Sequence, residues 1–259
     1  MSLIGERWRR VTWVLGTILS LGVVAFLVVF FLRFEAGRTF IDEFFNAATF
    51  RKAMPYVIKG LSLTVRLALV SEVFILVVGL IIALARISRN PLLRILAIIY
   101  IDVIRGLPLL LQIFIVYYGL AYLGFKLDPF VAGVAALTIC YAAYEAEIFR
   151  AGIESIHKGQ MEAARSLGMG YLQAMRYVVL PQAIRNVIPP LSNEFIALLK
   201  DTSLLSVIAL AEVLRRGTEM MGKYYNVTPL VCAAICYLII TLPLMRLVQY
   251  VTNRLSAGR

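Results

Sequence analysis

Eight ionisable side chains interrupt stretches of this sequence that are otherwise long and apolar. Charged groups are costly in hydrocarbon, so in a membrane they are expected to pair, to face the interior of a helix bundle or to line a wet path. The chemistry that they could supply there is charge pairing and hydrogen bonding to a polar solute. They are Lys59, Arg66, Glu72, Asp102, Arg105, Glu145, Glu147 and Glu194.

Several of these charges also have a structural explanation. Lys59 and Arg105 could reach water from the end of a span, because long basic side chains extend toward the membrane surface. Asp102 has the i,i+3 spacing of a local ion pair with Arg105. Arg66 could neutralise Glu72.

Two carboxylates are harder to explain by pairing. Glu145 and Glu147 lie in CYAAYEAEIF, where the next basic residue is Arg150. A wet cavity is therefore expected beside at least one of them. Two positions apart, they point about 200° apart around a helix, so both cannot easily face one ligand.

Catalytic chemistry has little support in the residue types. A single histidine, His157, leaves no partner for a His-based metal site. The spacing of Gly217, Gly222 and Lys223 matches a phosphate-binding loop, but Tyr224 stands where Ser or Thr would reach magnesium. We expect no catalytic residue, metal site or nucleotide site in this chain. Three cysteines in apolar runs are interpreted as packing residues: Cys140, Cys232 and Cys236.

The elements that position these groups are membrane helices. The chain has 259 residues, of which 61% are hydrophobic and 16% charged, and its mean hydropathy is +0.85. A span needs about 20 apolar residues, so we predict an all-α integral membrane protein with about six transmembrane helices. The predicted stretches are residues 11–32, 55–85, 92–122, 129–148, 187–199 and 227–245.

The distribution of basic residues predicts the orientation. Arg7, Arg9 and Arg10 precede the first stretch, which is too long for a secretory signal and has no small-x-small cleavage site after it. We interpret it as a retained helix. Basic residues outnumber acidic ones most strongly in segments 1–10, 86–94, 149–185 and 246–259, which places these segments and both termini in the cytoplasm. Since the net charge of +11 is scattered among the spans, a nucleic-acid partner is not expected.

The longest polar segment on the predicted cytoplasmic side runs from about residue 150 to 185. Gly159, Gly168 and Gly170 can break or cap helices, and Pro181 predicts an extended or kinked residue before it. The segment is typical of short helices separated by turns. A helical hairpin of this kind suggests the docking of a cytoplasmic partner.

This segment resembles the EAA signature of ABC importer membrane subunits. The family pattern is EAA, three residues, Gly, nine residues, Ile, any residue and Leu-Pro. Val178 replaces the usual Ile and keeps a β-branched apolar side chain. The matching positions are Glu162, Ala163, Ala164, Gly168, Val178, Leu180 and Pro181.

The resemblance extends from about Pro55 to the C-terminus and is to the polar amino-acid branch of the family. It includes RGLPLLLQIFIVYYGL, AEIFRAGIESI, LPQAIRNVIPPL and LLKDTSLLSVI. It implies a type I importer domain over residues 55–259, with residues 1–54 adding an N-terminal transmembrane helix and an external connection to a five-helix core. Three residues depart from the branch: Leu107 stands for a frequent Thr, Glu145 for a neutral residue, and Glu72 lies in a normally apolar run.

The resemblance also implies the partners. A cytoplasmic ABC ATPase dimer binds ATP and magnesium, a second membrane subunit, identical or paralogous, completes the cavity, and an extracytoplasmic binding protein delivers an amino acid. The chain itself is expected to need no cofactor, and to lie in a bacterial or archaeal cytoplasmic membrane. We expect Glu162 near the start of the coupling helix, where a carboxylate favours the helix dipole, Ala163 and Ala164 to permit close approach, and Gly168 to end the helix where a side chain would clash.

Candidates for the substrate path are polar groups on the predicted fourth and fifth spans. Glu147 and Asn193 are the first choices, and Glu145 and Glu72 are secondary. The excess of carboxylates in the spans favours arginine, lysine or histidine as substrate, with glutamine or glutamate as the alternative. An outer gate or docking edge is predicted after the fifth span, although its first two residues could simply cap the helix: Lys200, Asp201, Thr202 and Ser203.

Three other classes of membrane protein compete with this prediction. A secondary transporter commonly has inverted repeats and no motor-docking loop, and no convincing repeat is present. An intramembrane enzyme would need a nucleophile with a base or a set of metal ligands. A passive channel would show flux that does not depend on ATP.

Overall fold

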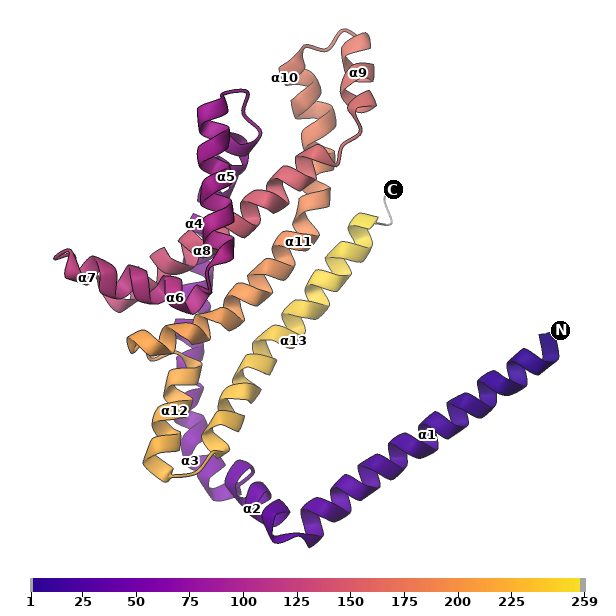
Figure 1. Ribbon diagram of the computed structural model, residues 1–259, viewed down its shortest axis with the longest axis vertical. Coiled ribbons are helices and arrows are strands. Elements are labelled where there is room, and N and C mark those ends of the chain that lie inside the picture. Colours follow the sequence, from indigo (N-terminus) through magenta and orange to yellow (C-terminus); the bar gives the residue numbers. More distant parts are fainter. Residues whose placement is uncertain (1, 257–259) are drawn as a thin grey trace.

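The computed structural model describes the backbone of residues 2–256 and the side chains of residues 12–30 and 33–255. The described chain is helical throughout, with turns between the helices (Figure 1). The side chains of Arg7, Arg9 and Arg10, which support the predicted orientation of the N-terminus, lie outside the described residues. The long elements are α1 (Ser2–Arg33), α4 (Gly60–Arg86), α5 (Pro91–Gly106), α8 (Pro129–Glu154), α11 (Leu180–Asp201) and α13 (Thr228–Ser256).

Four of these helices are long and apolar enough to cross a membrane, and a bent pair can form a fifth span. The four contain residues 12–30, 60–86, 129–154 and 228–255. They match four of the six predicted stretches closely. α11 has a sufficient length of 22 residues, but its prolines and polar side chains lower its apolar character, and it packs between α8 and α13.

The predicted stretch over residues 92–122 is broken rather than continuous. α5 ends at Gly106, and the chain restarts as α6 (Leu109–Phe114), a π-helical turn η1 (Ile115–Gly119) and α7 (Leu120–Tyr122), bent by 106°. Leu107 is extended because Pro108 follows it. The Gln112 side-chain amide donates to the carbonyls of Ile104 and Leu107, at 2.9 and 3.0 Å. These bonds satisfy backbone groups that the break leaves free.

α4 and α8 form the most extensive helix pair of the bundle. Their close approach depends on a residue without a side chain, because a Cβ added to Gly79 would lie 3.2 Å from Glu145 Cβ and 3.3 Å from the carbonyl oxygen of Ala142. Gly152 permits the same approach between α8 and α11, where an added Cβ would overlap Val187. Small residues at helix interfaces are the usual means of tight packing in membranes.

At the end opposite the hairpin of α9 (Lys158–Ser166) and α10 (Tyr171–Ala174), α3 (Ala47–Val57) and α12 (Val213–Tyr224) pack on the start of α13 (Figure 1). Glu212 caps α12 by accepting hydrogen bonds from the N–H groups of Leu214 and Arg215 and from the Tyr237 hydroxyl, at 2.8, 2.6 and 2.7 Å. Burial raises the pKa of the Glu212 carboxyl, whereas these hydrogen bonds lower it. Gly217 lies within helix α12, so the GxxxxGK spacing belongs to a helix and not to a loop.

The polar segment between α8 and α11 forms the helical hairpin that its turn residues predict. It consists of α9 (Lys158–Ser166), α10 (Tyr171–Ala174) and a π-helical turn η2 (Met175–Val179) that leads into α11. The residue before Pro181 was expected to be extended or kinked, and the extended alternative is not observed: Leu180 is helical, with φ −59° and ψ −43°. The π-helical turn instead accommodates the proline, which lies in the first turn of α11 where its missing N–H is tolerated.

α1 precedes α2 (Glu35–Phe44) in the chain and runs apart from the other long helices (Figure 1). Its apolar segment, residues 12–30, is wholly unburied. In a membrane, this surface faces lipid or a neighbouring subunit.

Candidate functional site

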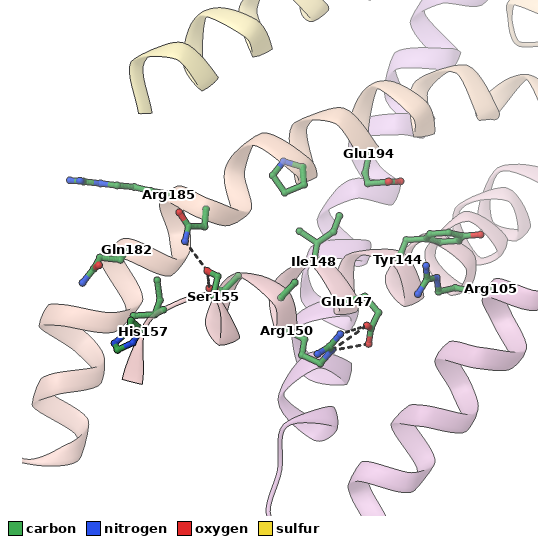
Figure 2. Close-up of a pocket in the computed structure, with 15 residues that line it drawn as sticks. Arg105, Tyr144, Glu147, Ile148, Arg150, Ser155, His157, Gln182, Arg185 and Glu194 are labelled. Atoms are coloured by element: carbon green, nitrogen blue, oxygen red, sulfur yellow. Dashed lines mark hydrogen bonds and ion pairs between the residues drawn. The ribbon is translucent and has the colours of Figure 1, made fainter. Parts of the chain in front are cut away.

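A cavity of about 1110 Å³ lies between α5, α8 and α11 (Figure 2). α5 contributes Arg105 and α8 contributes Tyr144, Glu147 and Arg150. From α11 come Gln182, Arg185, Asn186, Pro190 and Glu194. Basic and acidic groups therefore line one cavity, which suits a solute that carries both signs of charge.

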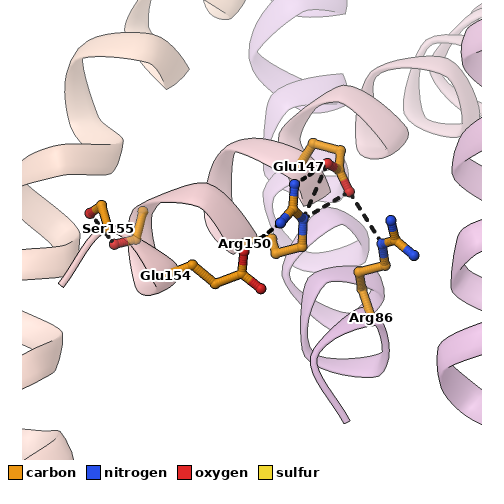
Figure 3. A network of polar contacts seen from close by, with 6 residues as sticks. Arg86, Glu147, Arg150, Glu154 and Ser155 are labelled. Carbon is orange, nitrogen blue, oxygen red and sulfur yellow. Dashed lines mark hydrogen bonds and ion pairs between the residues drawn. The ribbon is translucent and has the colours of Figure 1, made fainter. Parts of the chain in front are cut away.

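Glu147, the first predicted path residue, lines this cavity but is held by two arginines (Figure 3). Arg150 Nη2 lies 2.7 Å from Glu147 Oε2, and Arg86 Nε lies 3.5 Å from Oε1. Arg150 also contacts Glu154. These bonds lock the end of α8 against α4, so a solute can use the Glu147 carboxylate only by competing with Arg86 and Arg150.

Arg105 and Glu194 are two further charged residues that line the cavity, one basic and one acidic. The Arg105 guanidinium lies over the Tyr144 ring, 5.1 Å from its centroid, and Glu194 is half-buried. Glu194 accepts no hydrogen bond and forms no ion pair among the described residues. Because Arg105 and Glu194 are not bonded to each other, both remain open to a ligand.

Two local ion pairs considered from the sequence do not form. Arg105 stacks on Tyr144 rather than pairing with Asp102, and Arg66 lies 5.8 Å from the Phe130 ring centroid rather than on Glu72. Both arginines contact aromatic faces, a favourable setting for a guanidinium. The expected neutralisation of Glu72 was therefore wrong.

The remaining predicted path residues do not gather at this cavity. Glu145 is fully buried between α4 and α8, on a different side of α8 from Glu147, as their spacing predicts. Glu72 lines a smaller, largely apolar cavity of about 330 Å³ between α4, α11 and α13. Asn193 is exposed on α11, next to Glu194 in sequence but outside the cavity lining.

Sequence reasoning did not select Glu194, Tyr144 or Arg185 for this cavity. Glu194 was recognised as a charge within a span, but nothing in the sequence shows which side of α11 faces α8. Tyr144 and Glu147 are three residues apart, so helical spacing could have placed both on one face of α8. Arg185 and Glu194 lie nine residues apart, about 180° around an ideal helix, so helical spacing alone could not have placed both of them at this cavity.

The hairpin of α9 and α10 presents the EAA residues as a small rigid unit. Glu162 and Ala163 are exposed, whereas Ala164 is buried within the hairpin. Glu162 is the fifth residue of the nine-residue α9, not at its start, so the helix dipole does not act on it as expected. His157 caps the helix instead, with Nδ1 accepting from the N–H of Gly159 at 3.1 Å.

Gly168 ends α9, as predicted, but for a different reason. No atom lies within 4 Å of an added Cβ, so a side chain would not clash. The residue has φ +86°, which only glycine adopts without strain. The N–H groups of Gly168 and Met169 donate to the carbonyls of Arg165 and Ala164, which closes the helix end. Leu180 and Pro181, the last EAA positions, are exposed at the start of α11.

The residues predicted as an outer gate lie where α11 passes into the 3₁₀ helix η3 (Thr202–Ile208). Asp201 accepts a hydrogen bond of 2.7 Å from the Tyr141 hydroxyl of α8. Thr202 is fully buried and donates to the Leu199 carbonyl at 2.8 Å. Lys200 is exposed and Ser203 is half-buried. Asp201 and Thr202 thus fasten the helix end, and their part in a gate remains a prediction.

Comparison with known proteins identifies the family to which this chain belongs. Residues 75–257 match the family described as "Binding-protein-dependent transport system inner membrane component". The chain is 40% identical over 208 residues to the arginine transport system permease protein ArtQ of Bacillus subtilis, which covers 79% of this chain and 94% of that protein. It is 37% identical over 207 residues to the glutamine transport system permease protein GlnP of Escherichia coli, covering 79% and 94%.

A solved structure agrees in fold. The chain superposes with a TM-score of 0.74 and 42% identity on a chain of an amino acid ABC transporter crystallised with histidines, covering 78% of this chain and 95% of that one. The family match covers most of the sequence. It includes the EAA segment and the broken span described above. The chain belongs to the binding-protein-dependent transport system inner membrane components, as a permease subunit of an amino-acid ABC importer.

Proposed function

We propose that this subunit carries a polar L-amino acid through the cavity between α5, α8 and α11, and that separate ATPase subunits drive the movement through α9. The observation that carries the proposal is the pair of unbonded, oppositely charged groups, Arg105 and Glu194, in one cavity. A free amino acid has an α-carboxylate for the guanidinium and an α-ammonium for the carboxylate. Charge-assisted hydrogen bonds of this kind are stronger than neutral ones.

The side-chain class of the substrate depends on Glu147. If Glu147 stays bound to Arg86 and Arg150, the cavity has one free carboxylate, which the α-ammonium uses. A neutral polar side chain such as that of glutamine is then favoured. If the substrate displaces an arginine from Glu147, a basic side chain gains a partner, as the excess of carboxylates in the spans first suggested. Relatives whose names specify arginine and glutamine make both classes the first to be tested.

The proposed partners follow from surfaces that this chain leaves incomplete. A cytoplasmic ATPase dimer that binds ATP and magnesium would engage the exposed Glu162 and Ala163 of α9. A second membrane subunit would close the cavity, which is open in the single chain. An extracytoplasmic binding protein would deliver the amino acid at the end formed by α3 and α12. In this arrangement both termini are cytoplasmic, and movement of the hairpin as a rigid lever opens the cavity alternately to each side.

ATPase activity of the whole complex in lipid tests the substrate assignment. The complex is titrated with its binding protein and each of the twenty amino acids in turn. Stimulation by arginine, lysine or histidine would mean that Glu147 is released to the substrate. Stimulation by glutamine or glutamate would leave Glu147 a structural residue, and no stimulation by any amino acid would refute the proposal.

A further inference from the structure

A groove of about 340 Å³ lies apart from the transport cavity, where α2 and α3 meet the start of α13 (Figure 1). Its only charged lining residue among the described side chains is Arg51 of α3. The groove is open at its surface, since Phe45 is exposed and Val231 is only half-buried. The apolar residues that line it are Phe44, Phe45, Ala47, Phe50, Val231 and Ile235.

Hydrogen bonds hold the walls of this groove together. The Thr228 hydroxyl, at the start of α13, accepts from the N–H of Asn46 and donates to the carbonyl of Glu43, both at 3.0 Å. The Asn46 side chain caps α3 by accepting from the N–H of Thr49 at 2.9 Å. The turn between α2 and α3 is thus fastened to α13, so the groove is formed before any ligand binds, as is usual for ligand sites.

The groove lies at the depth where a membrane changes from hydrocarbon to headgroups. Val231 and Ile235 belong to the first two turns of α13, at the end of a candidate span. α2 has ten residues, too few to cross a membrane, and its Phe40 and Phe44 rings stack with centroids 4.3 Å apart. A helix with phenylalanines on one face and charges on the other lies in the membrane interface.

Arg51 gives the apolar groove a positive edge. Its side chain is exposed and forms no ion pair or hydrogen bond with another described residue, whereas Arg86 and Arg150 both bind Glu147. A guanidinium binds phosphate oxygens through paired, charge-assisted hydrogen bonds. An apolar helix from another protein would cover the walls but would leave this charge without a partner, which is costly.

We propose that this groove binds an anionic phospholipid, with an acyl chain against Phe45, Val231 and Ile235 and the headgroup phosphate on Arg51. The apolar walls match the chain, and the guanidinium matches the phosphate. Under the orientation proposed above, this lipid belongs to the outer leaflet. It contacts α2, α3 and α13 together, and a ligand that binds only the folded arrangement stabilises it. The site is separate from the cavity that holds the amino acid.

Photo-cross-linking of the complete transporter in lipid nanodiscs tests the site. The probe is phosphatidylglycerol with a photoreactive group on its acyl chain. We expect labelled peptides from α3 and from the first turns of α13, with unlabelled phosphatidylglycerol displacing the probe more effectively than phosphatidylcholine does. Arg51→Gln should weaken binding of the probe about tenfold, the effect of losing one hydrogen bond between charged groups. Lys52→Gln removes an exposed charge outside the lining and should change nothing.

A second variant separates the acyl-chain contact from the charge. Ala47 is exposed within the lining, so Ala47→Phe fills the groove without overpacking the core and should abolish labelling while Arg51 is still present. Equal displacement of the probe by the two lipids in the wild type would overturn the proposal, because the lipid contact would then be unselective. Absence of label from α3 and α13 in the wild type would also overturn it, since another chain would then cover the groove. Neither result depends on whether a variant folds.

Discussion

Glu194 shows how much the proposed role of a side chain depends on its neighbours. It is a half-buried carboxylate without an ion-pair partner among the described residues, in a cavity that also contains Arg105. Glu147, the stronger candidate from sequence, is already bound to two arginines. Whether a carboxylate has an ion-pair partner depends on its neighbours in space. The positions of single charges within long apolar stretches of sequence do not show those neighbours.

Replacement of Glu194 by Gln should weaken amino-acid uptake while leaving the fold intact. The variant keeps the shape of the side chain but loses the charge that we assign to the α-ammonium. A hydrogen bond to a charged group contributes about 1.5–3 kcal/mol, so the concentration for half-maximal uptake should rise roughly tenfold to a hundredfold. Uptake kinetics in proteoliposomes measure this shift, and Glu35→Gln, which removes an exposed carboxylate on α2, provides a control outside the cavity. An unchanged half-maximal concentration would remove Glu194 from the path.

Gly60 is a second position at which one residue has a large effect. An added Cβ would lie 2.7 Å from the backbone nitrogen of Val213 and 2.8 Å from the carbonyl carbon of Glu212. Backbone atoms cannot move aside as a flexible side chain can, so Gly60→Ala must push α4 away from α12.

We expect Gly60→Ala to destabilise the protein by about 1–3 kcal/mol, the usual cost of overpacking. Thermal unfolding of the purified complex in lipid measures the change. Gly222→Ala is the matched control, because Gly222 lies in α12 with open space around it and alanine favours a helix more than glycine does. Equal unfolding temperatures for the two variants would contradict the tight α4–α12 contact.

Among the helices, α9 is the element to which we assign the coupling to the ATPase. Its buried face carries Ala164, and Glu162 lies about 200° around the helix from it, exposed for a partner. Gly168 closes the helix and Pro181 begins α11, so the hairpin is fixed at both ends.

Charge reversal by Glu162→Lys should uncouple ATP hydrolysis from uptake while expression and folding stay intact. The exposed side chain contributes little to the fold, but a lysine would repel a basic residue of the ATPase. Parallel assays of ATP hydrolysis and uptake separate the two activities. Glu162→Gln distinguishes loss of charge from its reversal, and Glu35→Lys makes the same change on α2, away from the hairpin. Normal ATP-driven uptake by Glu162→Lys would refute the assignment of α9 as the coupling element.

The boundaries of the elements were largely predictable, because apolar length and turn residues act locally. The predicted stretch over residues 129–148 lies within α8, which Asp128 caps by accepting a hydrogen bond from the N–H of Phe130. Two features were not predictable. The break at Leu107 and Pro108 depends on Gln112 reaching back to Ile104, and the helical Leu180 depends on a π-helical turn. In both cases, a proline restricts the backbone of the residue before it, and the conformation that results depends on contacts or backbone geometry that the sequence pattern does not show.

The chain as a whole consists of a packed core and an additional helix. The core is formed by α4, α8, α11 and α13 with the short helices around them, and α1 adds a segment whose residues 12–30 are unburied. The family match over residues 75–257 begins within α4 and does not include α1. The predicted division of the chain at about residue 54 remains a prediction.

Deletion of residues 1–33 should therefore leave the core folded. Residues 12–30 of α1 are unburied, so their removal takes away little of the packing that holds the core together. Thermal unfolding of the truncated subunit within its complex measures this directly. A substantially lower unfolding temperature, or loss of the partner subunits, would mean that α1 packs against another chain.

The central claim is that this chain transports an amino acid only together with separate ATPase subunits. Uptake by vesicles with and without the ATPase tests this claim. Proteoliposomes that contain the complete complex, ATP and the binding protein should accumulate a labelled amino acid, and vesicles that lack the ATPase should accumulate none. An imposed ion gradient should not replace ATP. Accumulation by the membrane subunit alone, driven by an ion gradient, would contradict the proposal and identify a secondary transporter.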